Sequence, residues 1–232
     1  MKVALVTGAG VRVGLAIARD LARNGYRVAA HYRQHRPPRP LVALQADLAN
    51  PGGADALARA FRERFGHLDL LVCSAGGFES LPLQRTDARA FDAQMDLNAR
   101  APLLLARAFL PLLRRRPGAS IINIADIGGG LVPWAGYAAY AASKAALVRL
   151  TECLALELAP GIRVNAIAPG TVLWPEHDSP ARRRALTRRI PLRRTGTPQD
   201  VAEAVRYLAG AEFVTGVVLP VDGGRRLNGK ID

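Results

Sequence analysis

Cysteine and long apolar runs are scarce in this sequence. Its 232 residues include only Cys73 and Cys153, which lie far apart, so a disulfide framework and a cysteine-rich metal site are excluded. The longest apolar stretch, APLLLARAFLPLL at 101–113, contains an arginine and two prolines and is far shorter than the ~20 residues of a membrane span. The opening MKVALVTG has a strand pattern and no signal-peptide pattern. We therefore expect a cytoplasmic protein with no membrane partner.

Lysine is also scarce, although the net charge is +13. The only lysines are Lys2, Lys144 and Lys230, and the other cations are arginines spread along the chain, dense only at 114–116 and 182–194. A strongly basic protein can bind nucleic acid, but a codon bias toward arginine produces the same composition. We expect no nucleic-acid partner, and a positive field that attracts an anionic cofactor and substrate.

Short apolar, β-branched runs alternate with helical patterns along the whole chain. Half of the residues are apolar, which is enough to bury a substantial core. We expect strands at 3–8, 26–33, 41–48, 68–76, 120–126, 162–170 and 217–224, and helices at 13–25, 54–65, 88–115 and 140–158. This alternation predicts one doubly wound α/β domain over residues 1–232, with a parallel sheet covered on both faces.

One connection in this pattern is unusually short. Only QHRPPRP, residues 34–40, separates the second and third strands. A parallel crossover normally needs a dozen or more residues and usually a helix, but Pro37, Pro38 and Pro40 prevent a helix here. We expect an extended strap without a helix, which leaves one face of the sheet thinly covered.

A glycine-containing turn, TGAGVRVG at 7–14, lies between the first strand and the first helix. In this context Gly8 and Gly14 allow a tight turn and a close approach of the backbone to a pyrophosphate. The helix N-terminus adds free N–H groups and the positive end of its dipole. The pattern predicts a dinucleotide site, although Arg12 stands where such turns commonly have glycine or alanine.

The second strand ends at HYRQ, residues 31–34. A site that prefers NAD usually has Asp or Glu at this point, to bind the ribose 2′-hydroxyl. No acidic residue occurs between Asp20 and Asp47, and Arg33 takes this place. Because arginine pairs with a 2′-phosphate, we expect NADPH rather than NADH. The alternative is that Arg33 is an ordinary solvated arginine.

The segment YAASK places Tyr140 and Lys144 one helical turn apart on the same face. An isolated phenol has a pKa near 10, too high for acid–base work at neutral pH. A nearby ammonium favours the phenolate and lowers the pKa of the tyrosine. The pair is therefore a candidate acid–base site.

These motifs occur in a fixed order with ADL at Asp47, CSAG at 73–76, LNA at Asn98, RVNAIAPG at 163–170 and VDGG at 221–224. The sequence resembles the short-chain dehydrogenase/reductase family over essentially its whole length. The resemblance implies a Rossmann-type fold with Tyr140 as proton donor. It also implies that Lys144 binds the nicotinamide ribose and lowers the pKa of Tyr140, and that Asn98 holds a water of the proton relay.

By the same resemblance, the cofactor lies along the glycine turn and the strand ends. Asp47 and Leu48 flank the adenine, Ser74 replaces a common asparagine in the cofactor wall, and 169–171 wrap the nicotinamide end. The implied cofactor-binding set is Gly8, Arg12, Val13, Gly14, Tyr32, Arg33, Asp47, Leu48, Ser74, Ala75, Gly76, Tyr140, Lys144, Pro169, Gly170, Thr171 and Val172.

Three departures from the general family pattern narrow the resemblance: Ser74 in the cofactor wall, the residue at the catalytic serine, and Arg12. Ile127 stands where the family's catalytic serine is expected, but Asp126 aligns with that serine if the following loop has one extra residue. Together with Arg12 and Phe78, this resembles the pteridine reductase branch. There the arginine lies between phosphates and substrate, the aspartate supports proton transfer with Tyr140, and the phenylalanine stacks on the pterin.

The segment GTVLWPEHD, residues 170–178, also resembles the substrate loop of bacterial members of that branch, with Trp174 as a lid. We therefore expect an NADPH-dependent reductase of a pterin or dihydrofolate-like substrate, forming a homo-dimer or homo-tetramer as family members usually do. The four histidines show no ligand spacing, so we expect no catalytic metal.

Several alternatives remain open at this point. In a 3-oxoacyl-carrier-protein reductase, Asp126 and Arg12 are incidental and the basic surface docks an acidic carrier. A non-catalytic dinucleotide sensor and a nucleic-acid binder are further alternatives, and the presence of Asn98, Tyr140 and Lys144 argues against the sensor. Arg12 could contact phosphates alone, while Phe78 and Trp174 could be ordinary core. The sequence does not determine the exact substrate, the physiological direction or the oligomeric state.

Overall fold

The computed structural model of the chain describes residues 1–129, 131–174 and 178–228. Its strands are β1 (Lys2–Val6), β2 (Tyr26–Tyr32), β3 (Val42–Gln45), β4 (Leu70–Cys73), β5 (Ala119–Ile124), β6 (Ile162–Pro169) and β7 (Val218–Val221). Its α-helices are α1 (Arg12–Arg23), α2 (Gly53–Arg62), α3 (Ala88–Met95), α4 (Ala101–Leu113), α5 (Ala138–Leu158), α6 (Pro180–Arg189) and α7 (Pro198–Gly210). Short helices are η1 (Leu83–Arg85), η2 (Asp96–Arg100) and η3 (Arg225–Asn228).

The strands form one seven-stranded parallel sheet in the order β3-β2-β1-β4-β5-β6-β7. In the register of the central strands, Val6 of β1 lies between Ala30 of β2 and Val72 of β4. The strand order reverses between β1 and β4, and ligands of open α/β sheets bind at the carboxyl ends of the strands beside such a reversal. The predicted doubly wound Rossmann-type fold is confirmed.

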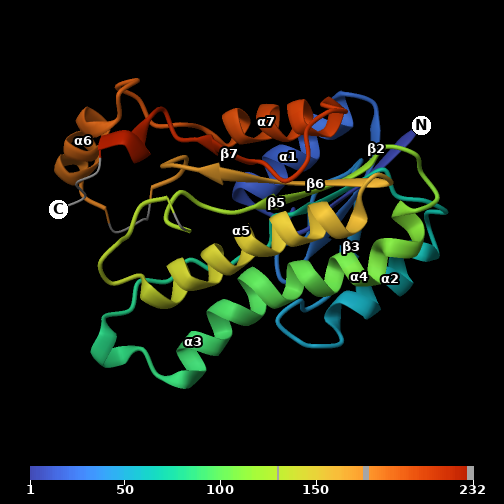
Figure 1. The fold of residues 1–232 in the computed structure, drawn as a ribbon, viewed down its shortest axis with the longest axis horizontal. Helices are drawn as coiled ribbons and strands as arrows, with labels where there is room; N and C mark the ends of the chain where they lie inside the picture. Colours follow the sequence, from blue (N-terminus) through green and yellow to red (C-terminus); the bar gives the residue numbers. More distant parts are fainter. Residues whose placement is uncertain (130, 175–177, 229–232) are drawn as a thin grey trace.

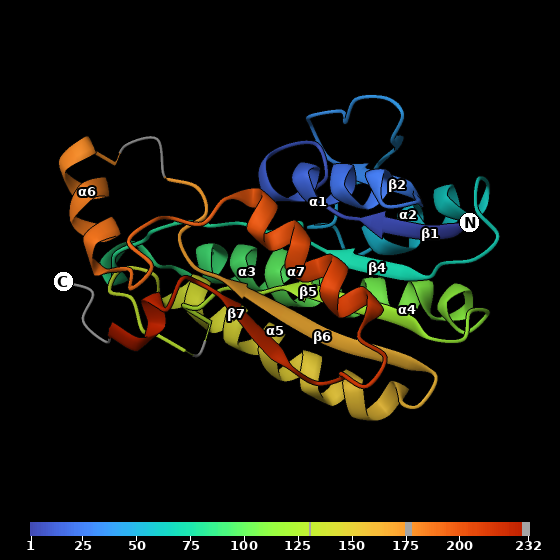
Figure 2. The same cartoon turned by 90° about the horizontal axis from the view of Figure 1, so that it is seen from above.

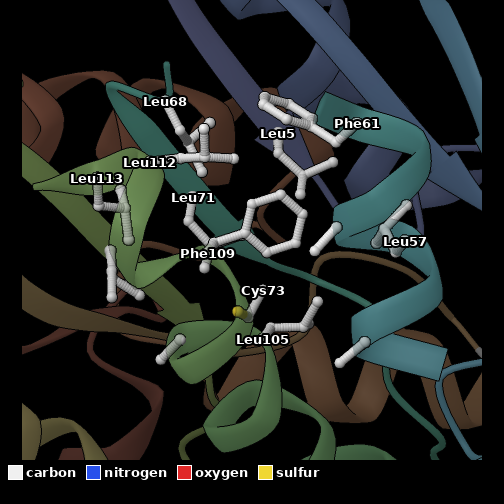
Figure 3. Packing of buried hydrophobic residues seen from close by; sticks show 14 of the residues in the cluster. Leu5, Leu57, Phe61, Leu68, Leu71, Cys73, Leu105, Phe109, Leu112 and Leu113 are labelled. Carbon is white, nitrogen blue, oxygen red and sulfur yellow. The ribbon is translucent and has the colours of Figure 1, made fainter. Parts of the chain in front are cut away.

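Helices cover both faces of the sheet (Figures 1 and 2): α1 and α7 lie on one face, and α2, α4 and α5 on the other. Successive residues of a strand point to opposite faces, so Leu5 of β1 packs with α2 and α4 whereas Val6 packs with α1 and α7. In the first of these cores, Phe61 of α2 meets Phe109 of α4 edge to face, with ring centres 5.2 Å apart (Figure 3).

The predicted strap between β2 and β3 is also confirmed, because residues 33–41 contain no helix. The strap packs against the glycine turn: a Cβ atom at Gly10 would lie 1.8 Å from the carbonyl oxygen of His35. A hollow of about 370 Å³ separates the strap from α1. The sheet beneath is nevertheless covered, since Val28 and Ala30 of β2 are buried, so the thin cover that we expected on this face stays a prediction.

The helical regions differ from the sequence-based prediction in two places. The stretch 88–115, predicted as one helix, is α3 and α4 joined by η2, a π-helical turn that inserts an extra residue into the helix. The segment 180–210, for which we predicted no helix, contains α6 and α7.

Within the described residues, no helix is both long and apolar enough to cross a membrane.

Candidate active site

The glycine turn is locked to two neighbouring strands by hydrogen bonds. The Oγ1 atom of Thr7 accepts hydrogen bonds from the backbone N–H groups of Ser74 and Ala75, both at 3.0 Å, at the end of β4. Gly8 has φ +66°, and a Cβ atom there would lie 2.9 Å from the Cα of Ala75. At Gly14 a Cβ atom would lie 2.3 Å from the carbonyl oxygen of Gly8. Both positions therefore require glycine, and the backbone is left bare where a pyrophosphate approaches.

His31, near the end of β2, supports the same turn from the other side. Its Nδ1 accepts the N–H of Gly8 at 3.1 Å, so its Nε2 carries the proton and lies 3.1 Å from the carbonyl oxygen of Ala46. Burial lowers the pKa of His31, which favours this neutral form. The sequence analysis gave His31 no role. The available signal was a polar residue within a buried strand.

Arg12 and Arg33 leave their guanidinium groups exposed around this turn. Arg12 has φ +53°, in the left-handed region that glycine adopts most easily, which explains why such turns commonly have glycine here. Arg33 directly follows Tyr32 at the end of β2. Neither side chain has an ion-pair or hydrogen-bond partner in the part of the chain that the structure describes. Both are therefore available to anionic phosphates.

The remaining predicted cofactor residues follow the carboxyl ends of the strands. Asp47 is exposed and Leu48 is buried just after β3, and Val13 is half-buried in α1. At the other end, Gly170 donates its N–H to Val221, and a Cβ atom there would lie 2.9 Å from the Cα of Asp222. The other members at these strand ends are Ser74, Ala75 and Gly76 after β4, Pro169 at the end of β6, and Thr171 and Val172 after it. The residues present fit a nicotinamide dinucleotide bound along this edge.

Asn98, Tyr140 and Lys144 are brought together and buried at the centre of the site. The Nζ of Lys144 donates to the carbonyl oxygen of Ile124 at 2.8 Å. A Cβ atom at Gly76 would lie 2.9 Å from the Oδ1 of Asn98 and 3.4 Å from the Nζ of Lys144, so Asn98 and Lys144 meet around this glycine.

The side-chain amide of Asn98, in the π-helical turn η2, is fully engaged with protein groups. Its Oδ1 accepts the N–H of Gly77 at 2.9 Å, and its Nδ2 donates to the carbonyl oxygen of Gly77 at 3.0 Å. Nδ2 also lies 3.0 Å from the Oγ of Ser143 and 3.2 Å from the Oε1 of Gln94. Asn98 therefore fixes the loop that leads to Phe78, and the water that we expected it to hold stays a prediction.

Asp126, and not Ile127, faces the hydroxyl of Tyr140. The charge of the Asp126 carboxyl acts on that phenol, and the Oδ1 of Asp126 accepts the N–H of Gly128 at 2.6 Å. Burial raises the pKa of Asp126 to about 6, against the lowering effects of that N–H and of nearby cations. The loop between β5 and α5 therefore has the length at which Asp126 takes the place aligned with serine.

The predicted effect of Lys144 on Tyr140 is not found in this structure. Burial raises the pKa of Tyr140 well above its ordinary value, and the charge of the neighbouring Asp126 raises it further. Lys144 is directed to Ile124 instead, and burial lowers its own pKa to about 8. The phenol therefore keeps its proton, which is the form that a proton donor needs.

Phe78 belongs to an aromatic cluster at the surface of the site. It is 51% exposed, so it is not an ordinary core residue. Its ring stacks on Tyr137 with centres 5.0 Å apart and meets Tyr140 edge to face at 4.9 Å. Trp134 completes the cluster, 6.4 Å from the ring of Phe78. The sequence analysis assigned no function to Trp134 or Tyr137.

Among the described residues, Trp174 makes no ring contact with this cluster. It lies instead near α6, where the guanidinium carbon of Arg183 is 6.0 Å from the centre of its ring. Residues 175–177 of the predicted substrate loop lie outside the described part of the chain. The role of Trp174 as a lid stays a prediction.

Comparisons with known proteins agree with this geometry. The family model described as enoyl-(acyl carrier protein) reductase matches residues 8–226. The chain is 36% identical to 2-(R)-hydroxypropyl-CoM dehydrogenase of Xanthobacter autotrophicus, over 96% of this chain and 97% of that protein. It is 34% identical to a 3-oxoacyl-[acyl-carrier-protein] reductase of Synechocystis sp., over 96% of both chains.

Solved structures are similar over nearly the whole chain. The ligand-free aldohexose dehydrogenase of Thermoplasma acidophilum has a TM-score of 0.91 and 29% identity, over 100% of this chain and 96% of that one. A blue fluorescent protein from a metagenomic library, in complex with NADPH, has a TM-score of 0.86 and 33% identity over 97% of both chains. The chain therefore belongs to the short-chain dehydrogenase/reductase family and is a nicotinamide-dependent oxidoreductase of a small-molecule substrate.

Proposed function

We propose that this protein is an NADPH-dependent reductase of a pterin or dihydrofolate-like substrate. The observation that carries the proposal is the place of the Asp126 carboxyl, which interacts with the phenol of Tyr140 from the position aligned with the family's serine. A serine at this place would hydrogen-bond a substrate carbonyl without adding charge. A carboxyl group with a pKa of about 6 can supply a proton to a ring nitrogen near neutral pH.

Two further side chains suit a flat, polar heterocycle. Phe78 meets Tyr140 edge to face and leaves much of its own ring exposed, where it can stack on a planar substrate. Arg12 has an exposed guanidinium at the glycine turn, where it can bridge cofactor phosphates and a polar ring edge. Arg12 begins α1, just after β1, and Phe78 lies on the loop after β4; β1 and β4 are the strands beside the reversal of strand order.

The reaction adds one hydride and one proton across a ring C=N bond. The reduced nicotinamide, when bound, supplies the hydride to the ring carbon. Tyr140 donates its hydroxyl proton to the ring nitrogen, and the protonated Asp126 then returns a proton to the phenolate. Lys144 holds the nicotinamide ribose, and Asn98 holds the loop of Phe78 in place.

NADPH is proposed over NADH because of the charges at the end of β2. Arg33 is exposed and unpaired within the described residues, and no acidic residue stands at the end of β2.

We also propose a homo-dimer or homo-tetramer formed through α4 and α5. Leu103 of α4 is 38% exposed and Leu156 of α5 is 84% exposed, which favours this helix pair as an apolar contact. Light scattering measures the mass of the assembly.

One screen tests the proposed function. NADPH oxidation is followed with dihydrobiopterin, dihydrofolate and an acetoacetyl thioester as substrates. We expect turnover of at least one of the first two compounds to exceed that of the thioester. Efficient reduction of the thioester, with no measurable turnover of either pterin compound, would refute the pterin proposal.

The second candidate function is reduction of a 3-oxoacyl group on an acidic carrier protein. The similarity to the Synechocystis sp. reductase favours it. So does α6, whose arginine-rich sequence PARRRALTRR leaves no residue buried and presents a basic surface near the site. The thioester in the same screen separates the two candidates.

A further inference from the structure

Arg225, in η3 near the end of the described chain, reaches back into the substrate side of the site. Its side chain is half-buried, and its Nη1 donates a hydrogen bond to the Oγ1 of Thr171. Its guanidinium carbon lies 5.3 Å from the centre of the Trp134 ring, within the range of a cation–π contact. Neither the family motifs nor the sequence analysis assigned Arg225 a role.

This one side chain joins the ends of three neighbouring strands. Trp134 belongs to the loop after β5, Thr171 to the loop after β6, and Arg225 itself follows β7. The base of η3 is fixed by Asp222, whose carbonyl oxygen accepts the N–H of Arg225 at 3.0 Å and whose Oδ2 accepts the N–H of Arg226 at 2.9 Å. Asp222 therefore fixes the backbone of Arg225, while Thr171 and Trp134 contact its guanidinium.

Trp134 connects Arg225 to the turn that orients Asp126. A Cβ atom at Gly128 would lie 3.0 Å from the Cε3 and Cζ3 atoms of Trp134 and 3.1 Å from the Oδ1 of Asp126. The indole thus rests on the glycine whose N–H holds the Asp126 carboxyl. Because the Nε1 of Trp134 is buried and has no acceptor among the described residues, contacts of its ring set its position.

Arg225 also acts on Asp126 through its charge. The charged groups around the Asp126 carboxyl are Lys144 and Arg225, with the hydroxyl of Tyr140 and the N–H of Gly128 as neutral partners. Burial raises the pKa of Asp126, and the cation of Arg225 acts in the opposite direction. Burial lowers the pKa of Arg225, and Asp126 and Asp222 oppose that change. Arg225 therefore reaches the same carboxyl in two ways: sterically through Trp134 and Gly128, and through the longer-range effect of its charge.

We propose that Arg225 is a positioning residue for the proton relay: it presses Trp134 onto the Gly128 turn and holds the Asp126 carboxyl, as its counter-charge, against Tyr140. The inference rests on the proposed function, in which Asp126 and Tyr140 move the proton. Its geometry is independent of substrate, so it has a test that needs no turnover.

The test uses Trp134 as a probe of the carboxyl. The sequence has two tryptophans, so Trp174→Phe leaves Trp134 as the only one, in contact with the Gly128 turn. Its fluorescence is titrated from pH 4.5 to 8.5. We expect a transition with a midpoint near the pKa of Asp126, about 6, which Asp126→Asn removes. Arg225→Met, which removes the cation, is expected to move the midpoint up. Arg225→Lys, which keeps the charge, is expected to leave it near the parental value.

Arg226→Met is the matched control, because Arg226 lies next to Arg225 but its Nη1 pairs with Asp222 at 3.1 Å. It is expected to leave the midpoint unchanged. An unmoved midpoint in folded Arg225→Met, or an equal shift in Arg226→Met, would overturn the proposal. If Arg225→Met does not fold, the charge-neutral Arg225→Gln takes its place with the same expected shift. Absence of pterin turnover together with the expected midpoint shift would refute the proposed function and leave the role of Arg225 standing.

Discussion

The arginines at the two ends of the site differ in what they already contact. At the cofactor end, Arg12 and Arg33 are exposed and have no partner among the described residues. At the substrate end, Arg225 is half-buried and engaged with Thr171 and Trp134. The unpaired guanidinium groups suit an external anion such as a phosphate, whereas the engaged one uses its charge within the protein. The cofactor end therefore depends on a ligand to complete it, and the substrate end is largely completed by the chain itself.

The two ends of the site also differ in how far their other groups are already bonded within the protein. Hydrogen bonds of Thr7 and His31 fix the backbone of the glycine turn without a ligand. The groups of this end without a partner among the described residues are the cationic side chains of Arg12 and Arg33. At the substrate end, the ring of Phe78 packs on those of Tyr137 and Tyr140. Burial raises the pKa of the Asp126 carboxyl at this end to about 6. Substitutions at one end should leave the other end working, and four of them test this separation.

The largest effect is expected for Tyr140→Phe. Removing the hydroxyl removes the proton donor but none of the groups at the cofactor end, so kcat should fall by about 10³-fold, within the usual range for acid catalysis. The affinity for NADPH, measured by fluorescence titration, should stay within about twofold because the phenol acts in the transition state. Near-normal turnover would show that Tyr140 is not the acid.

Asp126→Ser should lower pterin reduction by about two orders of magnitude and spare cofactor affinity. Because the acid is active when protonated and its pKa is about 6, kcat/KM of the parent should fall as the pH rises through 6. This limb of the pH profile should be absent in Asp126→Asn. A profile that is the same in both proteins would exclude Asp126 from the relay.

Arg33→Asp tests the cofactor end alone. The parent should bind NADPH at least tenfold more tightly than NADH, a difference of about 1.4 kcal/mol, because Arg33 pairs with the 2′-phosphate. The variant should lose or reverse this preference, while the kcat at saturating cofactor stays close to that of the parent. Equal affinities of the unsubstituted protein for the two cofactors would contradict this prediction.

Phe78→Ala should have the smallest effect. Loss of aromatic stacking is expected to cost about 0.5–1.5 kcal/mol, so the KM for the pterin should rise roughly two- to tenfold with little change in kcat. Steady-state kinetics at saturating NADPH measure both constants. A loss confined to kcat would instead place Phe78 with the groups that position Tyr140, which its ring also contacts.

The fold was largely predictable because strand and helix patterns alternate over almost the whole chain. The helix α6 was missed because none of its residues is buried, so it has no apolar stripe to recognise. The helix α7 did have signals: Thr197 and Asp200 form a capping box, and Val201, Val205 and Leu208 are buried at helical spacing. The π-helical turn at Asn98 was not predictable, since one extra residue hardly changes the apolar periodicity around it.

The site was predictable where spacing within one element decides it, as for Tyr140 and Lys144. Spacing could not choose between Asp126 and Ile127, because the loop before α5 determines which side chain faces Tyr140. Arg225 and Trp134 are far apart in the sequence and meet only when the loops after β5 and β7 fold together. Contacts of that kind have no signature in a single sequence.

Because Arg12 has a left-handed backbone, folding stability and catalytic activity should favour different residues at this position. A side chain in that conformation costs about 1–2 kcal/mol, which glycine avoids. In a library randomised at this codon, survivors of a heat challenge alone should therefore be enriched in Arg12→Gly. Survivors chosen for reductase turnover should keep arginine, because glycine offers no cation to a ligand. The codon frequencies under the two regimes would measure how strongly activity, against folding, maintains an arginine at residue 12.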